Sequence, residues 1–165
     1  MSQERTAPLQ NRVTPFGEIV AFAAHGGLMG NRGILHDDRK QLGAARWRTK
    51  AWISCALEWK GSRRTVISPG SYTELFFLDE ATSCAAGHRP CAQCRRRDYN
   101  RFVAAWRQAA GIGEGKPVTA SVIDARLHAD RVAPRTRGKI TFTAPLGDLP
   151  DGTMVTLPDA PSQAM

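Results

Sequence analysis

The sequence predicts an α+β domain, in which a small, mainly antiparallel sheet packs against two or three helices and is stapled by a metal ion. Apolar residues alternate with a period of two in residues 51–59, as in a strand, whereas the segments after Asp79 follow the helical period. A Cys-x-x-Cys pair, Cys91 and Cys94, lies in the helical half and supplies the expected metal ligands.

The first half of the chain predicts short strands separated by turns. Residues 1–15 are polar and predict a flexible N-terminal arm, and residues 17–24 predict the first strand. Residues 51–59 form the clearest strand, and a turn leads from it into residues 63–68, which we expect to pair with it as a hairpin. Residues 73–77 predict a further short apolar strand.

Helices dominate the second half. Asp79 lies near the start of a short helix that Gly87 ends. Pro90 suits the first position of a second helix, which runs to about Ala110. The remaining segments predict a third helix at residues 117–132, closing strands at 139–144 and 152–157, and a disordered tail at 158–165.

Length and composition predict one cytoplasmic domain, at residues 16–157. The chain has 165 residues, of which 42% are apolar, which is enough for a single core. It shows neither a membrane-spanning run nor the layout of a secretory signal, so we expect no membrane association. A reducing cytoplasm favours metal binding or free thiols over disulfides for its four cysteines.

The positive charge is concentrated in one third of the chain. Residues 89–139 hold 12 basic and 4 acidic residues, which accounts for the whole net charge of +8. Such asymmetry indicates a polyanionic partner, most simply nucleic acid, whereas a merely solvated surface is the alternative.

Cys91 and Cys94 have the spacing of a metal-binding turn. A redox pair is a second interpretation, but its usual place directly after a strand is missing here, since a short helix is expected before Gly87. Two thiols on the core face of a helix are a third interpretation, which fits Cys91 better than Cys94.

The segment "ELFFLDEATSCAAGHRPCAQCRRRD", residues 74–98, resembles the metal-binding domain of the Ada DNA-repair protein family. Its Gly-x-Arg-Pro-Cys-x-x-Cys core, from Gly87 to Cys94, carries the resemblance, with His88 where the family usually has an aromatic residue. The resemblance implies a zinc site of four cysteines, one of which accepts a methyl group from a DNA phosphotriester. The family has a Cys-x-x-x-Cys arrangement upstream, whereas this chain has Cys55 alone.

The expected metal is Zn²⁺, and Cys55 is the natural third ligand beside Cys91 and Cys94. Cys55 also lies on the apolar face of its strand, where a buried thiol needs no other role. His88 is the first candidate for the fourth ligand because it lies three residues before Cys91. The other candidates for that position are His36, Cys84 and a water molecule.

The helix after the cysteines is expected to present arginines to a phosphate backbone. A helical wheel groups Arg96, Arg97, Arg101 and Arg107 opposite the apolar face. Arg95 is expected to bind nucleic acid with them, although it falls in the apolar sector and therefore needs an acidic partner or a route to water.

A glycine-rich segment at residues 26–38 offers a second candidate site. Asn31 and Arg32 could bind a phosphate there, and His36 could act as a general base beside two aspartates. A glycine-rich loop with a solvated histidine is the alternative, since the glycine spacing matches neither the P-loop nor the dinucleotide-binding fingerprint.

These features together predict a zinc-stabilised domain that binds nucleic acid, with DNA as the expected partner, through a basic helix, in DNA damage response or regulation. A metal-dependent enzyme acting on a phosphate-containing substrate is the first alternative. A metal-stapled module that binds an acidic protein is the second.

Overall fold

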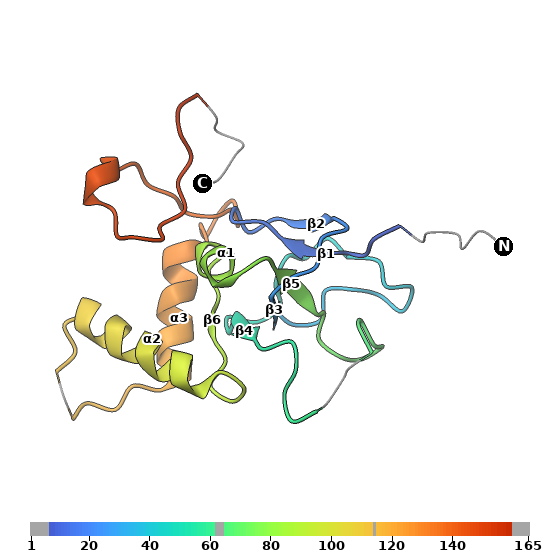
Figure 1. Cartoon of the computed structure of the whole chain (residues 1–165), viewed down its shortest axis with the longest axis horizontal. Coiled ribbons are helices and arrows are strands. Elements are labelled where there is room, and N and C mark those ends of the chain that lie inside the picture. Colours follow the sequence, from blue (N-terminus) through green and yellow to red (C-terminus); the bar gives the residue numbers. More distant parts are fainter. Residues whose placement is uncertain (1–6, 62–64, 114, 160–165) are drawn as a thin grey trace.

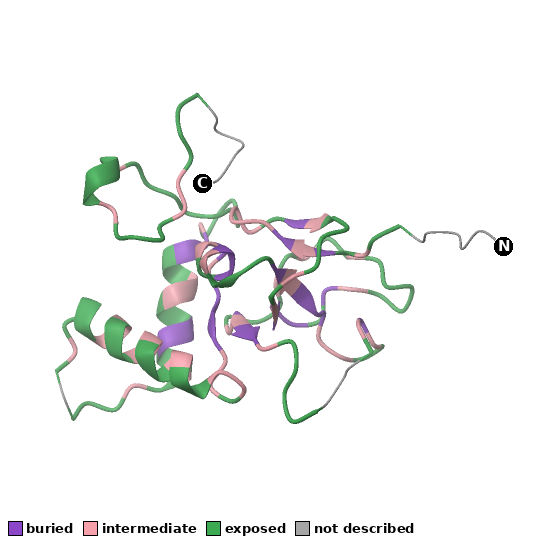
Figure 2. Cartoon of the chain, in the orientation of Figure 1, coloured by how far each residue is buried: buried purple, intermediate pink, exposed green. Residues whose placement is uncertain are grey.

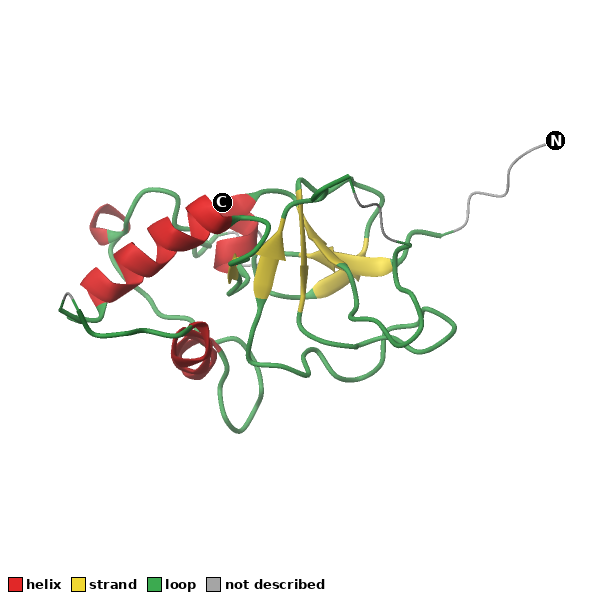
Figure 3. Ribbon diagram, turned by 90° about the horizontal axis from the view of Figure 1, so that it is seen from below, coloured by secondary structure: helices red, strands yellow, loops and turns green. Residues whose placement is uncertain are grey.

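The computed structural model describes residues 7–61, 65–113 and 115–159, and it shows the predicted α+β class (Figure 1). A six-stranded sheet lies beside three α-helices, and the two kinds of element occupy opposite sides of the molecule (Figure 3). The strands are β1 (Gln10–Val13), β2 (Ile19–Ala21), β3 (Leu28–Asn31), β4 (Ile53–Cys55), β5 (Leu75–Phe77) and β6 (Arg89–Pro90). The helices are α1 (Glu80–Ala85), α2 (Arg96–Ala109) and α3 (Ala120–Arg131), with a 3₁₀ turn at Leu146–Asp148.

The sheet has the strand order β2-β1-β5-β3-β4-β6 and is mixed. β1 pairs antiparallel with β2, and β3 pairs antiparallel with both β4 and β5. The β1–β5 and β4–β6 pairs are parallel. The mainly antiparallel sheet was predicted, and each of the two parallel pairs includes one of the strands that flank α1, β5 or β6.

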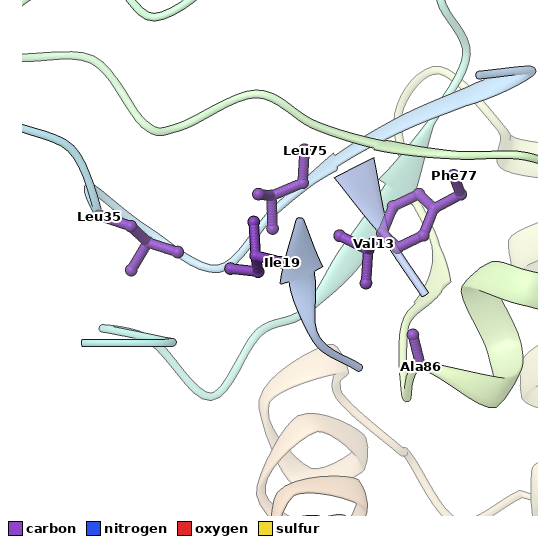
Figure 4. Packing of buried hydrophobic residues seen from close by; sticks show 6 residues of the cluster. All are labelled: Val13, Ile19, Leu35, Leu75, Phe77 and Ala86. Atoms are coloured by element: carbon purple, nitrogen blue, oxygen red, sulfur yellow. The ribbon is translucent and has the colours of Figure 1, made fainter. Parts of the chain in front are cut away.

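The hydrophobic core lies against one face of the sheet. Figure 2 shows the buried segments concentrated on the central strands, α1 and the inner side of α3. The core cluster consists of Val13, Ile19, Leu35, Leu75, Phe77 and Ala86, whose side chains converge in Figure 4.

Local capping explains where α1 begins and ends. The carboxylate of Asp79 accepts a hydrogen bond from the backbone N–H of Thr82 at 2.7 Å, which satisfies a free donor of the first turn. Gly87 follows the last turn with φ = +87°, and a Cβ there would lie 2.7 Å from Cδ of Arg131. Gly87 therefore combines a left-handed backbone with a close approach that other residues would obstruct.

Several expected elements are corrected by the structure. The strand expected over residues 51–59 is reduced to β4, and its expected hairpin partner at residues 65–68 is not a strand, while residues 62–64 lie outside the described residues. β4 pairs instead with β3 and β6. The segments at residues 139–144 and 152–157 contain no strand.

The N-terminal arm and the second helix are also shorter than expected. Residues 10–13 form β1 inside the sheet, so the expected arm over residues 1–15 is wrong there, and residues 1–6 lie outside the described residues. Pro90 belongs to β6 rather than to the start of α2, which begins six residues later at Arg96. The tail expected at residues 158–165 lies outside the described residues from residue 160 onward.

None of the helices in the described part of the chain has the length and apolar character that crossing a bilayer requires.

Candidate metal centre

Three of the four cysteines meet at the junction of the sheet and α2. The sulfur atoms of Cys55, Cys91 and Cys94 all lie within 4.8 Å of one another. Cys55 ends β4, and the parallel pairing of β4 with β6 continues through a 2.8 Å hydrogen bond from the backbone N–H of Cys91 to the carbonyl oxygen of Ser54. Sheet pairing therefore brings a cysteine 36 residues upstream next to the Cys-x-x-Cys turn.

Backbone N–H groups point at these sulfur atoms. The N–H of Gln93 donates to Sγ of Cys91 at 3.4 Å, and the N–H of Ala56 donates to the Cys94 thiol. Such N–H···S contacts stabilise thiolates, which are the form that binds a metal ion.

The three thiols also shift one another's pKa. The hydrogen bond from the Cys55 thiol lowers the pKa of Cys91 to about 4, and backbone N–H groups of Cys94 and Gln93 act in the same direction. The same hydrogen bond raises the pKa of Cys55, and burial adds to that increase. Burial raises the pKa of Cys94. In the absence of a metal ion the cluster therefore holds its negative charge on Cys91.

This donor set fits a metal ion that prefers sulfur. Cys55 is buried, whereas Cys91 and Cys94 are partly exposed, so an ion could enter from the side of the turn. A tetrahedral ion held by three thiolates keeps one position for a further ligand.

The structure places His88 elsewhere, which corrects its expected role as the fourth ligand. His88 is only 2% exposed and lies outside the group of three thiols. Its ring contacts those of Phe77 and Trp52, with centroid distances of 4.5 Å and 5.4 Å, and its Nε2 accepts a hydrogen bond from Nε of Arg32 at 3.2 Å. Burial, followed by the charges of Arg32 and Arg131, lowers the pKa of His88 well below its usual value. His88 is a neutral core residue.

Cys84 and His36 do not join the thiol group either. Cys84 lies on the exposed side of α1. Nδ1 of His36 lies 2.7 Å from the hydroxyl of Thr73, so His36 links two loops.

Arg95 has the acidic partners that its place in the apolar sector required. Its side chain is 9% exposed and forms ion pairs with Glu80 of α1 and with Asp98, the latter at 3.0 Å. It also donates to the hydroxyl of Ser54 at 3.0 Å. Arg95 thus ties the cysteine turn to α1 and β4, and its guanidinium is not available to a phosphate.

The other four arginines of the basic helix differ in their surroundings. Arg96, Arg97 and Arg101 are exposed, and Arg101 lies 3.7 Å from the partly exposed carboxylate of Asp98. Arg107 instead donates to the carbonyl oxygens of Gly113 and Lys116, the latter at 2.6 Å, and so holds the loop that follows α2. The exposed basic surface is therefore the set Arg96, Arg97 and Arg101, which we call the α2 arginines.

The glycine-rich segment does not form the phosphate site that its composition suggested. Arg32 is 1% exposed, donates to the carbonyl oxygen of Gly17 at 2.9 Å and lies 4.1 Å above the ring of Trp52. Asn31 accepts a hydrogen bond from the N–H of Gly33 and so closes a local turn. These side chains are used within the fold.

Sequence reasoning missed the buried arginines Arg131 and Arg89. Arg131 lies 4.0 Å from the Trp52 ring and donates to the carbonyl oxygens of Gly87 and Lys50. Arg89 is buried in an ion pair with Asp124 of α3. The sequence held one signal that Trp52 contacts other parts of the chain than the metal site does: the alternation of residues 51–59 places Trp52 and Cys55 on opposite faces of the strand.

Searches against protein-family models, curated proteins and solved structures find no match to this chain.

Proposed function

We propose that the chain binds zinc through Cys55, Cys91 and Cys94 and binds nucleic acid, most simply DNA, through the α2 arginines. The observation that carries this proposal is that the turn holding Cys91 and Cys94 leads directly into α2. A metal ion on this turn would fix the start of the helix against β4, and with it the direction in which Arg96 and Arg97 point.

Zinc is the ion that best suits this donor set. It binds thiolate sulfur strongly, has no redox chemistry of its own and accepts four ligands in a tetrahedron. The three cysteines would supply three of them, and an exchangeable water or an external thiol would supply the fourth.

The α2 arginines suit a phosphate backbone. Arg97 and Arg101 are four residues apart and so lie on the same side of the helix, with Arg96 beside them. Neither Arg96 nor Arg97 has an acidic partner among the described residues. The resemblance to the Ada family supports a role in DNA damage response or regulation.

A metal-dependent enzyme is supported less well. The open coordination position would suit one, but the three residues expected to bind and activate its phosphate-containing substrate, Asn31, Arg32 and His36, are engaged within the fold.

The salt dependence of DNA binding tests the proposal. We would measure the affinity for a labelled duplex by fluorescence anisotropy over a range of salt concentrations. A variant with Arg96→Gln, Arg97→Gln and Arg101→Gln should bind more weakly. The plot of log K against log salt has a negative slope, and its magnitude should decrease by about 0.9 for each phosphate that the variant no longer neutralises.

The matched control is a variant with Arg39→Gln, Arg126→Gln and Arg135→Gln, which removes the same charge from exposed positions elsewhere. The slope of log K against log salt should change less in this control than in the variant of the α2 arginines. Equal losses of affinity in both variants would indicate unspecific attraction by the net charge, and no binding by the zinc-loaded protein would refute the proposed function.

A further inference from the structure

The face of the sheet opposite the core carries a row of side chains that leads to the metal centre. Arg12 of β1 pairs with Phe76 of β5, Phe76 pairs with Met29 of β3, and Met29 pairs with Cys55 of β4. Directly paired residues point to the same side of a sheet. The four side chains therefore share one face, whereas Leu75 and Phe77 point into the core on the other.

A groove of about 560 Å³ lies over the Arg12 end of this row. Arg12, Phe76, His25 and Leu57 line it, and the first two belong to the row itself. Leu57 is two residues beyond Cys55, so the lining reaches the segment next to the metal centre. Among the described lining residues, the ionisable side chains are Arg12 and His25, which are both basic.

Arg12 is held in a fixed orientation over the aromatic ring of Phe76. Its Cζ lies 5.0 Å from the ring centroid, and its Nε donates to the carbonyl oxygen of Ala24 at 2.6 Å. Its Nη1 donates to the side-chain oxygen of Asn11, which is 1% exposed and anchored by a 3.1 Å bond to the carbonyl oxygen of Glu74. A ligand that uses this guanidinium plane would not have to order it first.

We propose that this groove binds one unpaired nucleotide, with its base stacked against the Arg12–Phe76 pair and its phosphate next to the basic groups of Arg12 and His25. The guanidinium of Arg12 and the ring of Phe76 both offer a flat face to a base, and the positive charge of Arg12 attracts a phosphate. The bases of an intact duplex have their faces stacked on one another, so only an unpaired base can enter. This inference rests on the proposed function, because it assigns the α2 arginines and the groove to the same nucleic acid.

The first test uses a mononucleotide on the zinc-loaded full chain. Titration with deoxyadenosine monophosphate, followed by NMR, should shift the ring signals of Phe76 and the methyl signals of Leu57. The triple glutamine variant of the α2 arginines should show the same shifts, because the groove does not include that helix. Absence of shifts at Phe76 and Leu57 at millimolar nucleotide would overturn the inference, whatever the α2 arginines bind.

The second test compares a single-stranded oligonucleotide with the duplex of the same sequence. Phe76→Leu and Arg12→Lys should each weaken single-strand binding about tenfold, which is the loss typical of one stacked base. Both should leave duplex binding unchanged. Arg12→Lys keeps the charge and removes the flat guanidinium, so unchanged single-strand affinity in this variant would refute stacking.

Phe142→Leu is the matched control, because Phe142 is 80% exposed and belongs to neither the groove nor α2. It should bind both probes as the native chain does.

Loss of duplex binding in the α2 variant together with unchanged nucleotide shifts would support both assignments. NMR shifts with the nucleotide but no duplex binding would support the nucleotide site in the groove and refute the role of the α2 arginines in DNA binding. Equal shifts with an apolar peptide would refute nucleotide recognition by the groove.

Discussion

Arg89 donates two hydrogen bonds to Asp124, from Nε to Oδ1 at 2.7 Å and from Nη2 to Oδ2 at 2.8 Å. The two side chains are only 5% and 8% exposed. Arg89 is the residue before Pro90, and its Nη1 also donates to the carbonyl oxygen of Pro90 at 3.1 Å. The pair therefore connects α3 to the strand that leads into the cysteine turn.

We expect Asp124→Ala to lower the free energy of unfolding by about 3–5 kcal/mol, because it leaves the buried Arg89 guanidinium without its partner. Urea unfolding of the metal-loaded protein measures the change. Asp130→Ala is the control, since it removes an exposed ion pair with Arg126 and should cost about 0.5 kcal/mol or less. Similar losses in the two variants would contradict a stabilising role for the buried pair.

Stability should fall as the pH decreases below about 6.5, because of His88. Burial first, then the charges of Arg32 and Arg131, lowers the pKa of His88 in the folded chain, while the unfolded chain takes up its proton near pH 6.5. Protonation then favours the unfolded state, with a slope of up to about 1.4 kcal/mol per pH unit and no effect well above pH 7.

His88→Phe should flatten this dependence, and urea unfolding at several pH values measures it. Some slope should remain, because burial also lowers the pKa of His128. The variant should also lose some stability at neutral pH, since Arg32 loses the acceptor for its Nε. Exposed His25→Gln serves as the control, and an equal change of slope in that variant would argue against His88 as the cause.

Features with a local cause could be predicted from the sequence. The start of α1 follows from Asp79 and its end from Gly87, because a capping carboxylate and a left-handed glycine act within one turn. The need of Arg95 for an acidic partner followed from the helical period alone, and the structure supplies Glu80 and Asp98. Cys91 and Cys94 were expected together from their spacing, and the structure groups them with Cys55, the expected third ligand, through the distant pairing of β4 with β6.

Features set by distant pairing could not be predicted. Pro90 suits the first turn of a helix, but its fixed φ and missing N–H also suit a short edge strand, and pairing with β4 selects the strand. Arg32 lies among glycines that indicate an exposed loop, and only the distant partners Trp52 and His88 explain its burial. The strand β4 likewise pairs with β3 and β6 rather than with the next segment in the sequence. The Ada resemblance stays a prediction.

Metal content should separate the ligands from the other candidates. Cys55→Ser, Cys91→Ser and Cys94→Ser should each lose most of the zinc that the native chain retains after purification, because two thiolates hold the ion less firmly than three. Elemental mass spectrometry measures it. Cys84→Ser and His88→Phe should retain native zinc content, since neither side chain belongs to the thiol group. Zinc that survives Cys55→Ser would show that the sheet cysteine is not a ligand.

The metal-free protein should carry a reactive thiolate at Cys91. The hydrogen bond from Cys55 lowers the pKa of Cys91 to about 4, so Cys91 should be ionised throughout the range from pH 6 to pH 8. Its alkylation by iodoacetamide, followed by mass spectrometry of the peptides, should then be almost independent of pH in that range. An ordinary thiol reacts about tenfold faster for each unit by which the pH rises towards its pKa, because only the thiolate is nucleophilic.

Cys84 provides the internal comparison in the same experiment. Cys84 is accessible to the reagent, while partial desolvation and the charge of Glu80 raise its pKa, so its alkylation should increase steeply with pH. Cys55→Ala should make the alkylation of Cys91 depend more strongly on pH, because it removes the thiol that donates to Cys91 and leaves only the backbone N–H donors. A steep pH dependence of Cys91 alkylation in the native metal-free chain would show that the hydrogen bond from Cys55 does not hold Cys91 as a thiolate. Added zinc should protect Cys91 and leave Cys84 reactive, since the ion occupies the thiolate that the reagent attacks.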